Sequence, residues 1–223
     1  CKMTTAILIP ARYASTRFPG KMMAPLNGVP LVEVVYNKCS ATGLDTYVLT
    51  DAQEVYNHMG GGKCIMTQEA ENGTERCMQV IDEKLQYDRY INVQGDMPDI
   101  TSEIILAVEN ELHRSDVATA YTPMDFNLRN DPNSVKMIHS RGRAHWFLRA
   151  SLEYGDHHLG IYGYNREAKA MYNASTKFVE EDIEKLEQLR WIQNGVRIGV
   201  VEVEFDGIEI NTPEDLEKWQ TQN

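Results

Sequence analysis

Residues 6–21 read Ala6-Ile7-Leu8-Ile9-Pro10-Ala11-Arg12-Tyr13-Ala14-Ser15-Thr16-Arg17-Phe18-Pro19-Gly20-Lys21. The first four are apolar, which is typical of a short buried strand. The segment that follows carries three cations among small and hydroxylated residues and one glycine. A loop of this kind, at the carboxyl end of a strand, offers backbone N–H groups and positive charge to phosphates. A solvated surface loop has the same composition, so both interpretations stay open until the rest of the chain is considered.

The segment downstream alternates strands and helices. Apolar runs predict further strands at 46–50, 64–66, 89–93 and 117–121. Helical spacing predicts helices at 31–40, 53–59 and about 101–112, and another after the polar turn at 71–76 with apolar residues at Met78, Ile81 and Leu85. This alternation predicts an α/β fold, a mostly parallel Rossmann-like twisted sheet flanked by helices. Ligands of such sheets bind beyond the carboxyl ends of the strands, where the cationic loop, Asp51 and Asp96 fall.

The pattern changes from about residue 130. Strand-like runs at 135–138 and 144–149 predict a hairpin with Gly142 in its turn, and 160–164 predicts another strand. A helix is predicted at 180–194, a long strand at 196–205, and a final helix from Thr212-Pro213 to about residue 220. We therefore expect one domain over 1–223, with a smaller mixed β subregion for substrate binding or dimerisation at about 130–165.

The composition excludes several kinds of partner. The 223 residues are 42% hydrophobic and 25% charged, and 22 basic against 33 acidic residues give a net charge of −11. This charge argues against nonspecific binding to nucleic acid or to anionic membranes. The cysteines, Cys1, Cys39, Cys64 and Cys77, form no C-x-x-C pair and are expected to be reduced thiols. With no apolar run of transmembrane length and no signal-peptide core, we expect a cytoplasmic protein without membrane insertion.

Several ordered motifs resemble the 3-deoxy-manno-octulosonate (Kdo) cytidylyltransferases, and the resemblance runs nearly end to end. The matching pieces are 9–21; Thr50-Asp51; Gly73-Thr74-Glu75-Arg76; Asn92-Val93-Gln94-Gly95-Asp96 with Pro98; Asp131-Pro132-Asn133 with Val135-Lys136; 158–164; 186–190; and 211–217. The resemblance implies an enzyme that joins CTP and an acidic sugar into a CMP-sugar and releases pyrophosphate. It further implies a Mg²⁺ cofactor, a homodimer and a role in lipopolysaccharide biosynthesis.

The resemblance also implies roles for residues near the nucleotide. Lys21, Asp96 and Arg12 are the expected catalytic residues, with Asp96 as a Mg²⁺ ligand. The expected nucleotide contacts are Pro10, Ala11, Arg12, Arg17, Lys21, Gly73, Thr74, Arg76 and Gln94. From the residues alone, Arg17 also suits a surface position, Thr74 a helix N-cap, and Asp96 a turn.

A second set of residues is expected to bind the acidic sugar: Gln94, Arg149, His158, Tyr162 and Glu187. Arg149 suits a carboxylate because its guanidinium donates two parallel hydrogen bonds. Two adjacent histidines are also typical of a surface, and Glu187 also suits the solvated face of a helix.

Three features depart from the family pattern. Asn211 stands where the family has an aspartate that helps to hold metal, so Asn211 is the second expected metal ligand and supplies an amide oxygen instead of a carboxylate. Met97 follows Asp96 where the family has glutamate, and the segment between Arg149 and His158 is short. These departures keep two alternatives open: the same chemistry on another acidic sugar or a phosphonate, and a weakly catalytic CTP-binding relative.

Overall fold

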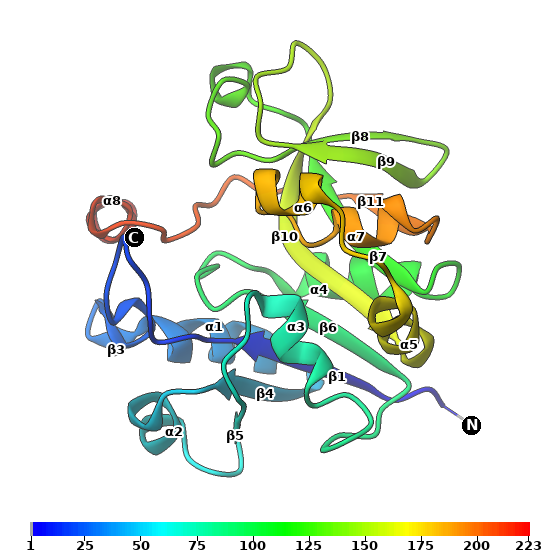
Figure 1. The fold of residues 1–223 in the computed structure, drawn as a ribbon. Coiled ribbons are helices and arrows are strands. Elements are labelled where there is room, and N and C mark those ends of the chain that lie inside the picture. The colour runs from blue at the N-terminus through cyan, green and yellow to red at the C-terminus, as the bar shows by residue number, and fades with distance from the viewer. Residues whose placement is uncertain (1) are drawn as a thin grey trace. The chain divides into compact units, whose positions relative to one another are not determined.

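The computed structural model describes residues 2–223, which form two compact units (Figure 1). Unit 1 comprises residues 2–105 and 206–223, and unit 2 comprises residues 106–205. The subregion predicted at 130–165 lies inside unit 2. Cys1 lies outside the described residues, whereas Cys39, Cys64 and Cys77 are buried. No helix within residues 2–223 is long and apolar enough to cross a membrane.

A parallel four-stranded sheet forms the centre of unit 1. Its order is β5-β4-β1-β6, and every neighbouring pair is parallel. The strands are β1 (Thr5–Pro10), β4 (Asp45–Thr50), β5 (Cys64–Met66) and β6 (Arg89–Val93). All residues of β1 and β6 are buried, as expected for a strand covered on both faces. The parallel sheet predicted from the apolar runs is confirmed.

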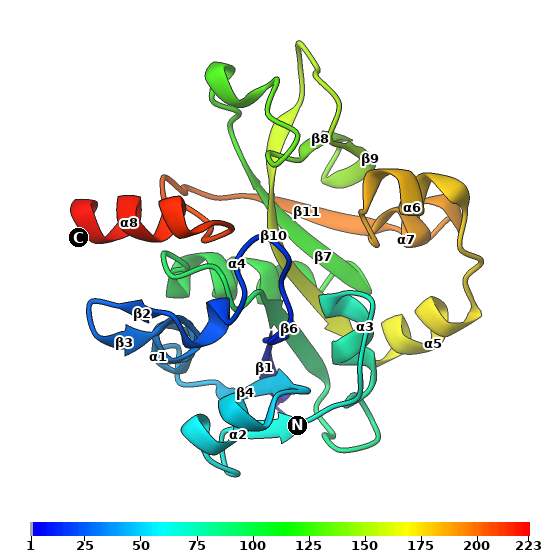
Figure 2. The same cartoon turned by 60° about the vertical axis from the view of Figure 1, so that its left-hand side comes forward.

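Helices cover both faces of this sheet, with α1 and α3 on opposite sides of β1 in both views (Figures 1 and 2). The helices of unit 1 are α1 (Leu31–Ser40), α2 (Gln53–Met59), α3 (Gly73–Met78) and α8 (Pro213–Gln222), with a 3₁₀ turn η1 (Lys21–Met23). A small hairpin, β2 (Pro25–Leu26) and β3 (Val29–Pro30), turns at Asn27-Gly28, where both residues have positive φ as a tight hairpin turn requires.

Unit 2 contains a mixed sheet in the order β10-β7-β11-β9-β8, and β10 also pairs with β8. Its strands are β7 (Val117–Thr122), β8 (Lys136–Ser140), β9 (Arg143–Leu148), β10 (Asp156–Asn165) and β11 (Ile198–Glu202), with a 3₁₀ turn η2 (Phe126–Leu128). Only β7 and β11 run parallel within it. The hairpin predicted around Gly142 is confirmed, whereas the strand predicted at 196–205 is shorter than expected.

Both faces of this second sheet are packed by helices. Helix α4 (Ser102–Glu111) begins in unit 1 and ends in unit 2, where Val108 and the following Leu112 lie 3.1 and 3.0 Å from where a Cβ on Gly163 would stand. The next residue, Tyr164, points to the other face and packs its ring 5.5 Å from the Trp191 ring. Trp191 belongs to α7 (Leu189–Gln193), which also contacts α5 (Arg166–Ala174). Helix α5, capped by the Asn165 side chain, was not predicted.

The single helix predicted at 180–194 is wrong. The chain forms two short helices, α6 (Val179–Glu184) and α7, and Lys185 between them has a φ of 56°. The reason is that the carbonyl oxygens of Glu184 and Lys185 accept hydrogen bonds from the Arg149 guanidinium instead of from the next helical turn. Ile183, expected on the buried face, is 72% exposed as a result.

The helix predicted to continue from the 71–76 turn to Leu85 is also shorter than expected. Helix α3 ends at Met78, and Asp82 has a φ of 64°. The backbone N–H groups of Asp82 and Leu85 bond to Leu85 and Val80, which closes a compact turn. The apolar residues Met78, Ile81 and Val80 are buried in this turn and not along one helix face.

Candidate active site

Backbone hydrogen bonds bring together the carboxyl ends of three strands in unit 1. The Ala11 N–H donates to the Leu49 carbonyl at 2.8 Å, and the Gly95 N–H donates to the Pro10 carbonyl at 3.3 Å. The Thr50 hydroxyl donates to the Ala11 carbonyl at 2.7 Å. The predicted nucleotide residues Pro10 and Ala11 therefore lie beside the loop that follows β6.

Gly95 allows a close approach at this edge. A Cβ at this position would stand 2.8 Å from Met22 Sδ and 3.1 Å from the Pro10 carbonyl oxygen. Real side chains essentially never approach this closely, and the carbonyl belongs to the backbone and yields little. The glycine thus holds the two loops against each other, and it places its neighbour Asp96 beside the start of the cationic loop.

Lys21 and Asp96, two of the expected catalytic residues, form an ion pair. Lys21 Nζ lies 3.1 Å from Asp96 Oδ2, and the two side chains are 13% and 19% exposed. A partly buried pair is screened less than a surface pair. The structure therefore joins a cation from the first loop to a carboxylate from the β6 loop, as a site for charged phosphate chemistry requires.

The C-terminal segment of unit 1 returns to the same edge. The Ile210 N–H donates to the Asp96 carbonyl at 2.9 Å, which brings Asn211 next to Asp96. The Asn211 and Thr212 N–H groups both donate to Asp215 Oδ2 at 2.9 Å, within the capping box that begins α8. The predicted helix start at Thr212-Pro213 is confirmed.

Asp99 anchors this segment, and sequence reasoning missed it. Its Oδ2 accepts the Ile208 N–H at 2.9 Å, and its Oδ1 accepts the Trp219 indole N–H at 2.8 Å. A Cβ on Gly207 would stand 2.3 Å from the Asp99 Cβ. The contacts span more than 100 residues, so no local pattern signals them, and they fix Asn211 in place.

Asp96 and Asn211 offer oxygen atoms suited to a hard cation. No group of three or more His, Cys, Asp or Glu side chains within residues 2–223 is arranged to hold a metal. Mg²⁺ does not need such a group, because proteins hold it with one or two carboxylates, water and the phosphates of the substrate. The side-chain oxygens of Asp96 and Asn211 are therefore of the kind that suits a Mg²⁺ arriving with a nucleotide.

An open pocket of about 470 Å³ lies on the cationic loop. The residues lining it are Arg12, Tyr13, Ala14, Ser15, Thr16, Pro19 and Gly20. Gly20 has a φ of 69°, and the Phe18 N–H bonds to the Ser15 hydroxyl at 3.2 Å, so the loop has a defined turn. Arg12 and Arg17 are exposed on it. A hydrogen bond to Glu54 raises the pKa of Tyr13, which links the loop to α2.

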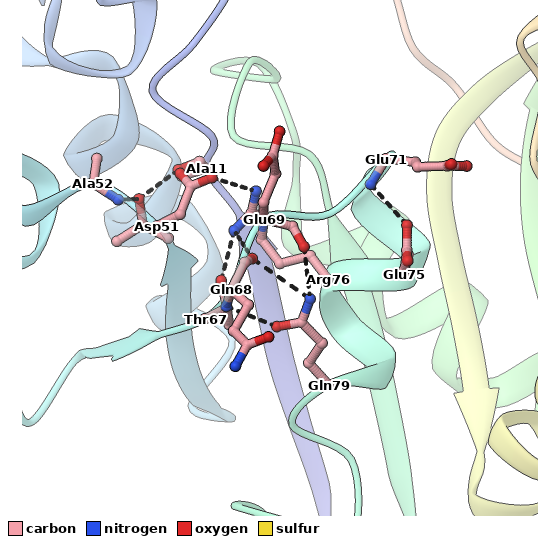
Figure 3. Close-up of polar contacts among 11 residues, drawn as sticks. Ala11, Asp51, Ala52, Thr67, Gln68, Glu69, Glu71, Glu75, Arg76 and Gln79 are labelled. Carbon is pink, nitrogen blue, oxygen red and sulfur yellow. Dashed lines mark hydrogen bonds and ion pairs between the residues drawn. The ribbon is translucent and has the colours of Figure 1, made fainter.

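Arg76 is engaged within the protein (Figure 3). The side chain is 2% exposed, and Nη1 donates to the Thr67 hydroxyl at 2.6 Å and to the Gln68 carbonyl at 3.1 Å. Nη2 pairs with Asp51 Oδ2 at 3.1 Å. The residue therefore ties the end of β4 to the segment after β5. A direct contact of Arg76 with the nucleotide stays a prediction.

Gly73 and Gln94, both expected to contact the nucleotide, lie against each other. A Cβ on Gly73 would be 2.9 Å from both the amide nitrogen and the amide oxygen of Gln94. The Gln94 amide donates to the Asn92 side chain at 3.0 Å. The N-cap of α3 is Asn72, whose side chain accepts the Glu75 N–H, so the suggestion that Thr74 caps this helix is wrong. Thr74 is fully buried.

Arg149 of unit 2 joins three segments. Its Nε donates to the Glu184 carbonyl at 2.7 Å, Nη1 to the Pro132 carbonyl at 3.0 Å and Nη2 to the Lys185 carbonyl at 3.4 Å. The backbone N–H of Arg149 donates to Glu184 Oε2 at 2.9 Å. A guanidinium has five N–H donors, so two of them are not used in these contacts.

His158 is buried and neutral, which excludes the surface alternative for this residue. It is 5% exposed, and burial, with smaller effects from His157 and Arg149, lowers its pKa to about 3. Its Nε2 lies 2.8 Å from the Thr119 hydroxyl, which itself donates to the Ile161 carbonyl at 2.7 Å. The hydroxyl has one hydrogen, so Nε2 is the donor and Nδ1 is left as an acceptor.

Two further residues expected to contact the sugar lie in unit 2. The Tyr162 ring is 5.5 Å from the His158 ring, so these two come together as predicted. Glu187 is half-buried in the turn between α6 and α7, where its carbonyl accepts the Arg190 N–H. It does not lie on the solvated face of a helix, because the helix predicted there does not form.

Comparison with known proteins identifies the family of this chain. The cytidylyltransferase family model matches residues 6–198. An 8-amino-3,8-dideoxy-manno-octulosonate cytidylyltransferase of Shewanella halifaxensis (strain HAW-EB4) is 38% identical over 96% of this chain and 96% of its own length. A 3-deoxy-manno-octulosonate cytidylyltransferase 2 of Hydrogenovibrio crunogenus (strain DSM 25203 / XCL-2) is 37% identical over 98% of this chain and 97% of its own.

Among solved structures, a CMP:2-keto-3-deoxy-manno-octonic acid synthetase complexed with CTP matches with a TM-score of 0.90. Identity is 32%, and the match covers 98% of each chain. This match confirms the predicted Rossmann-like nucleotidyltransferase fold. With the family model and the relatives, it shows that the chain belongs to the cytidylyltransferase family and confirms its resemblance to the Kdo cytidylyltransferases.

Proposed function

We propose that this enzyme transfers CMP from CTP to the anomeric hydroxyl of Kdo, giving CMP-Kdo and pyrophosphate. The observation that carries the proposal is the Lys21–Asp96 ion pair of 3.1 Å, held by Gly95 at the carboxyl ends of β1 and β6. In an open α/β sheet this edge is where nucleotides bind.

Different residues of unit 1 are proposed to bind the phosphates and the base of CTP. Arg12 and Arg17, exposed on the cationic loop, bind the phosphates and offset the charge of the departing pyrophosphate. Lys21 contacts the same group from the base of the loop, with Asp96 fixing its ammonium. Gly73, whose missing side chain lets the Gln94 amide lie against its backbone, is the proposed contact of the base together with Gln94. Little covalent chemistry is required of the protein, so positioning and charge stabilisation carry the reaction.

Mg²⁺ is the proposed cofactor, held by Asp96 and Asn211 together with the nucleotide phosphates. When bound, it neutralises charge on the phosphate oxygens. Calorimetric titration of Mg²⁺ into the protein with a nonhydrolysable CTP analogue tests this without turnover. Asp96→Asn is expected to weaken the Mg²⁺-dependent part of the binding at least tenfold. An unchanged affinity would remove Asp96 from the metal site.

In unit 2, the residues proposed for the acidic sugar are Arg149, His158, Tyr162 and Glu187. Arg149 retains two unused N–H donors for the carboxylate. His158, neutral and with Nδ1 free to accept, suits a sugar hydroxyl and not the carboxylate.

The 8-amino analogue of Kdo is the second candidate acceptor, because a relative at 38% identity is named for it. Both acceptors share the carboxylate and the anomeric hydroxyl, so the site above takes either. Pyrophosphate release with CTP, Mg²⁺ and each acceptor in turn tests the proposal. Release with Kdo supports the first candidate, and release only with the amino sugar supports the second. No release with either, while CTP still binds, would point to another acid or to the weakly catalytic alternative.

A homodimer remains part of the proposal. Light scattering coupled to size-exclusion chromatography is expected to give twice the 25.4 kDa of one chain. A mass of one chain at assay concentration would contradict it.

A further inference from the structure

Lys136 carries a buried ammonium group that has no role in the proposed reaction. The residue lies on β8 and is 0% exposed. Its Nζ donates to the Asp131 carbonyl at 2.8 Å and to the Arg149 carbonyl at 2.9 Å. Within residues 2–223 no carboxylate pairs directly with this ammonium, and one of its three N–H donors takes part in neither of the two hydrogen bonds.

Lys136 and Arg149 bind the same parts of unit 2. The Lys136 ammonium joins the loop before β8 to the backbone of Arg149, which follows β9. The Arg149 guanidinium in turn bonds to Pro132, in the same loop, and to Glu184 and Lys185 at the end of α6. The two cations therefore close one network of three segments, with the backbone of Arg149 held between the Lys136 ammonium and the Glu184 carboxylate.

The charged groups of this network act on one another and on His157. Burial lowers the pKa of Lys136, while the carboxylates of Asp131 and Glu184 act in the opposite direction and Arg149 adds to the lowering. Burial and then the charge of Lys136 lower the pKa of His157, its partner on β10.

A buried lysine without a carboxylate is costly, and an apolar side chain of similar size is often at least as stable in such a place. Fold stability alone therefore does not explain why a charged lysine stands at position 136. Its hydrogen bond to the backbone carbonyl of Arg149 suggests that it positions this arginine.

We propose that Lys136 is a positioning residue for the acidic-sugar site, because it fixes Arg149 and the 131–135 loop from inside the unit. The inference rests on the proposed function, in which Arg149 meets the carboxylate of the acceptor. Lys136 itself is fully buried and acts through Arg149, so its removal loosens the sugar site while the nucleotide site in unit 1 stays intact.

The test compares Lys136→Met, which keeps the length but removes the charge and both hydrogen bonds, with Lys136→Gln, which keeps N–H donors. We expect Lys136→Met to raise the KM of the acidic sugar at least tenfold and to change the KM of CTP less than twofold. Lys136→Gln is expected to restore part of the loss. Lys177→Met is the matched control, since Lys177 is an exposed lysine of the same unit paired with Asp182.

A double-mutant cycle tests the route through Arg149. Arg149→Gln alone is expected to raise the KM of the sugar, and adding Lys136→Gln is expected to raise it less than twofold further. Additive effects would overturn the positioning role, as would a folded Lys136→Met with an unchanged sugar KM. Where Lys136→Met does not fold, as judged by circular dichroism and CTP binding, Lys136→Gln and the cycle decide. Absence of turnover in the unaltered enzyme would instead refute the proposed function.

Discussion

Asp96→Asn is the substitution that bears most directly on the proposed chemistry. Asparagine has the same shape as aspartate and keeps one side-chain oxygen, so the change removes charge without removing bulk. The carboxylate lies 3.1 Å from Lys21 Nζ and is 19% exposed. The backbone carbonyl of residue 96, which accepts the Ile210 N–H, is unaffected. The fold is therefore expected to survive.

The size of the effect follows from the charge and its surroundings. Two unit charges about 4 Å apart interact by about 4 kcal/mol at the effective dielectric constant near a protein surface. If the lost charge acts on the transition state, each 1.4 kcal/mol is about a factor of ten in rate, so kcat falls by roughly 10²–10³. Thermal stability is expected to fall by only about 1 kcal/mol, because the pair is partly exposed and the amide retains an acceptor.

The assay is steady-state pyrophosphate release with CTP, Mg²⁺ and the acidic sugar, together with a thermal melt. Asp206→Asn is the matched control, because it removes the same charge from an exposed position of the same unit. We expect near-native turnover for the control and a loss of at least 100-fold for Asp96→Asn. A folded Asp96→Asn with turnover within tenfold of the unaltered enzyme would refute the assigned role of this carboxylate.

Three further predictions follow from buried contacts. Arg76→Met removes three hydrogen bonds and should lower the free energy of unfolding by about 3 kcal/mol, or Tm by roughly 10 °C; an unchanged melt would contradict its clamping role. Gly95→Ala should cost about 1–3 kcal/mol and lower turnover, since its Cβ would lie 3.1 Å from a backbone carbonyl. Gly62→Ala is the control, because its added Cβ would have no atom within 4 Å. Equal melting temperatures for Gly95→Ala and Gly62→Ala would refute the argument. His158 has a pKa lowered to about 3 by burial, so the folded state binds fewer protons than the unfolded state below pH 6.5. The contribution of neutral His158 to the free energy of unfolding is complete above pH 6.5. It is lost as the pH falls toward 3, by about 1.4 kcal/mol per pH unit. In denaturant titrations from pH 7 to 4, the free energy of unfolding of His158→Gln should therefore fall less steeply than that of the unaltered protein. Equal slopes for the two proteins would contradict the burial of a neutral His158.

The parallel sheet could be predicted from the sequence because its strands are continuous apolar runs. Residues 6–9, 46–50 and 89–93 alternate with helical segments, and a sheet covered on both faces needs this pattern. The same pattern placed Asp96 at the carboxyl edge. The ion pair between Asp96 and Lys21 joins two loops 75 residues apart, and it was not predicted from the sequence.

The misjudged helices show what local patterns leave out. Residues 180–194 have helical spacing, yet Arg149 takes the carbonyls of Glu184 and Lys185 and ends α6. A tertiary hydrogen bond overrides propensity in this case, and no feature of the segment itself signals it. Arg149 was expected from the resemblance to bind the sugar, while its three backbone acceptors became visible only in the folded chain.

Long-range anchors were missed for the same reason. Asp99 is one residue among several in a polar turn, and its two partners lie 109 and 120 residues further along the chain. Lys136 was noted as part of a motif, but its complete burial could not be predicted, because lysine is almost never fully buried.

The measurement that tests the central claim most directly is the fate of the α-phosphorus of CTP. The enzyme is incubated with CTP, Mg²⁺ and Kdo, and the products are followed by ³¹P NMR and mass spectrometry. We expect a phosphodiester joining CMP to the anomeric oxygen of Kdo, formed in equal amount with pyrophosphate and absent with Asp96→Asn. Release of pyrophosphate with free CMP alone, or no change in CTP under conditions where it binds, would contradict it.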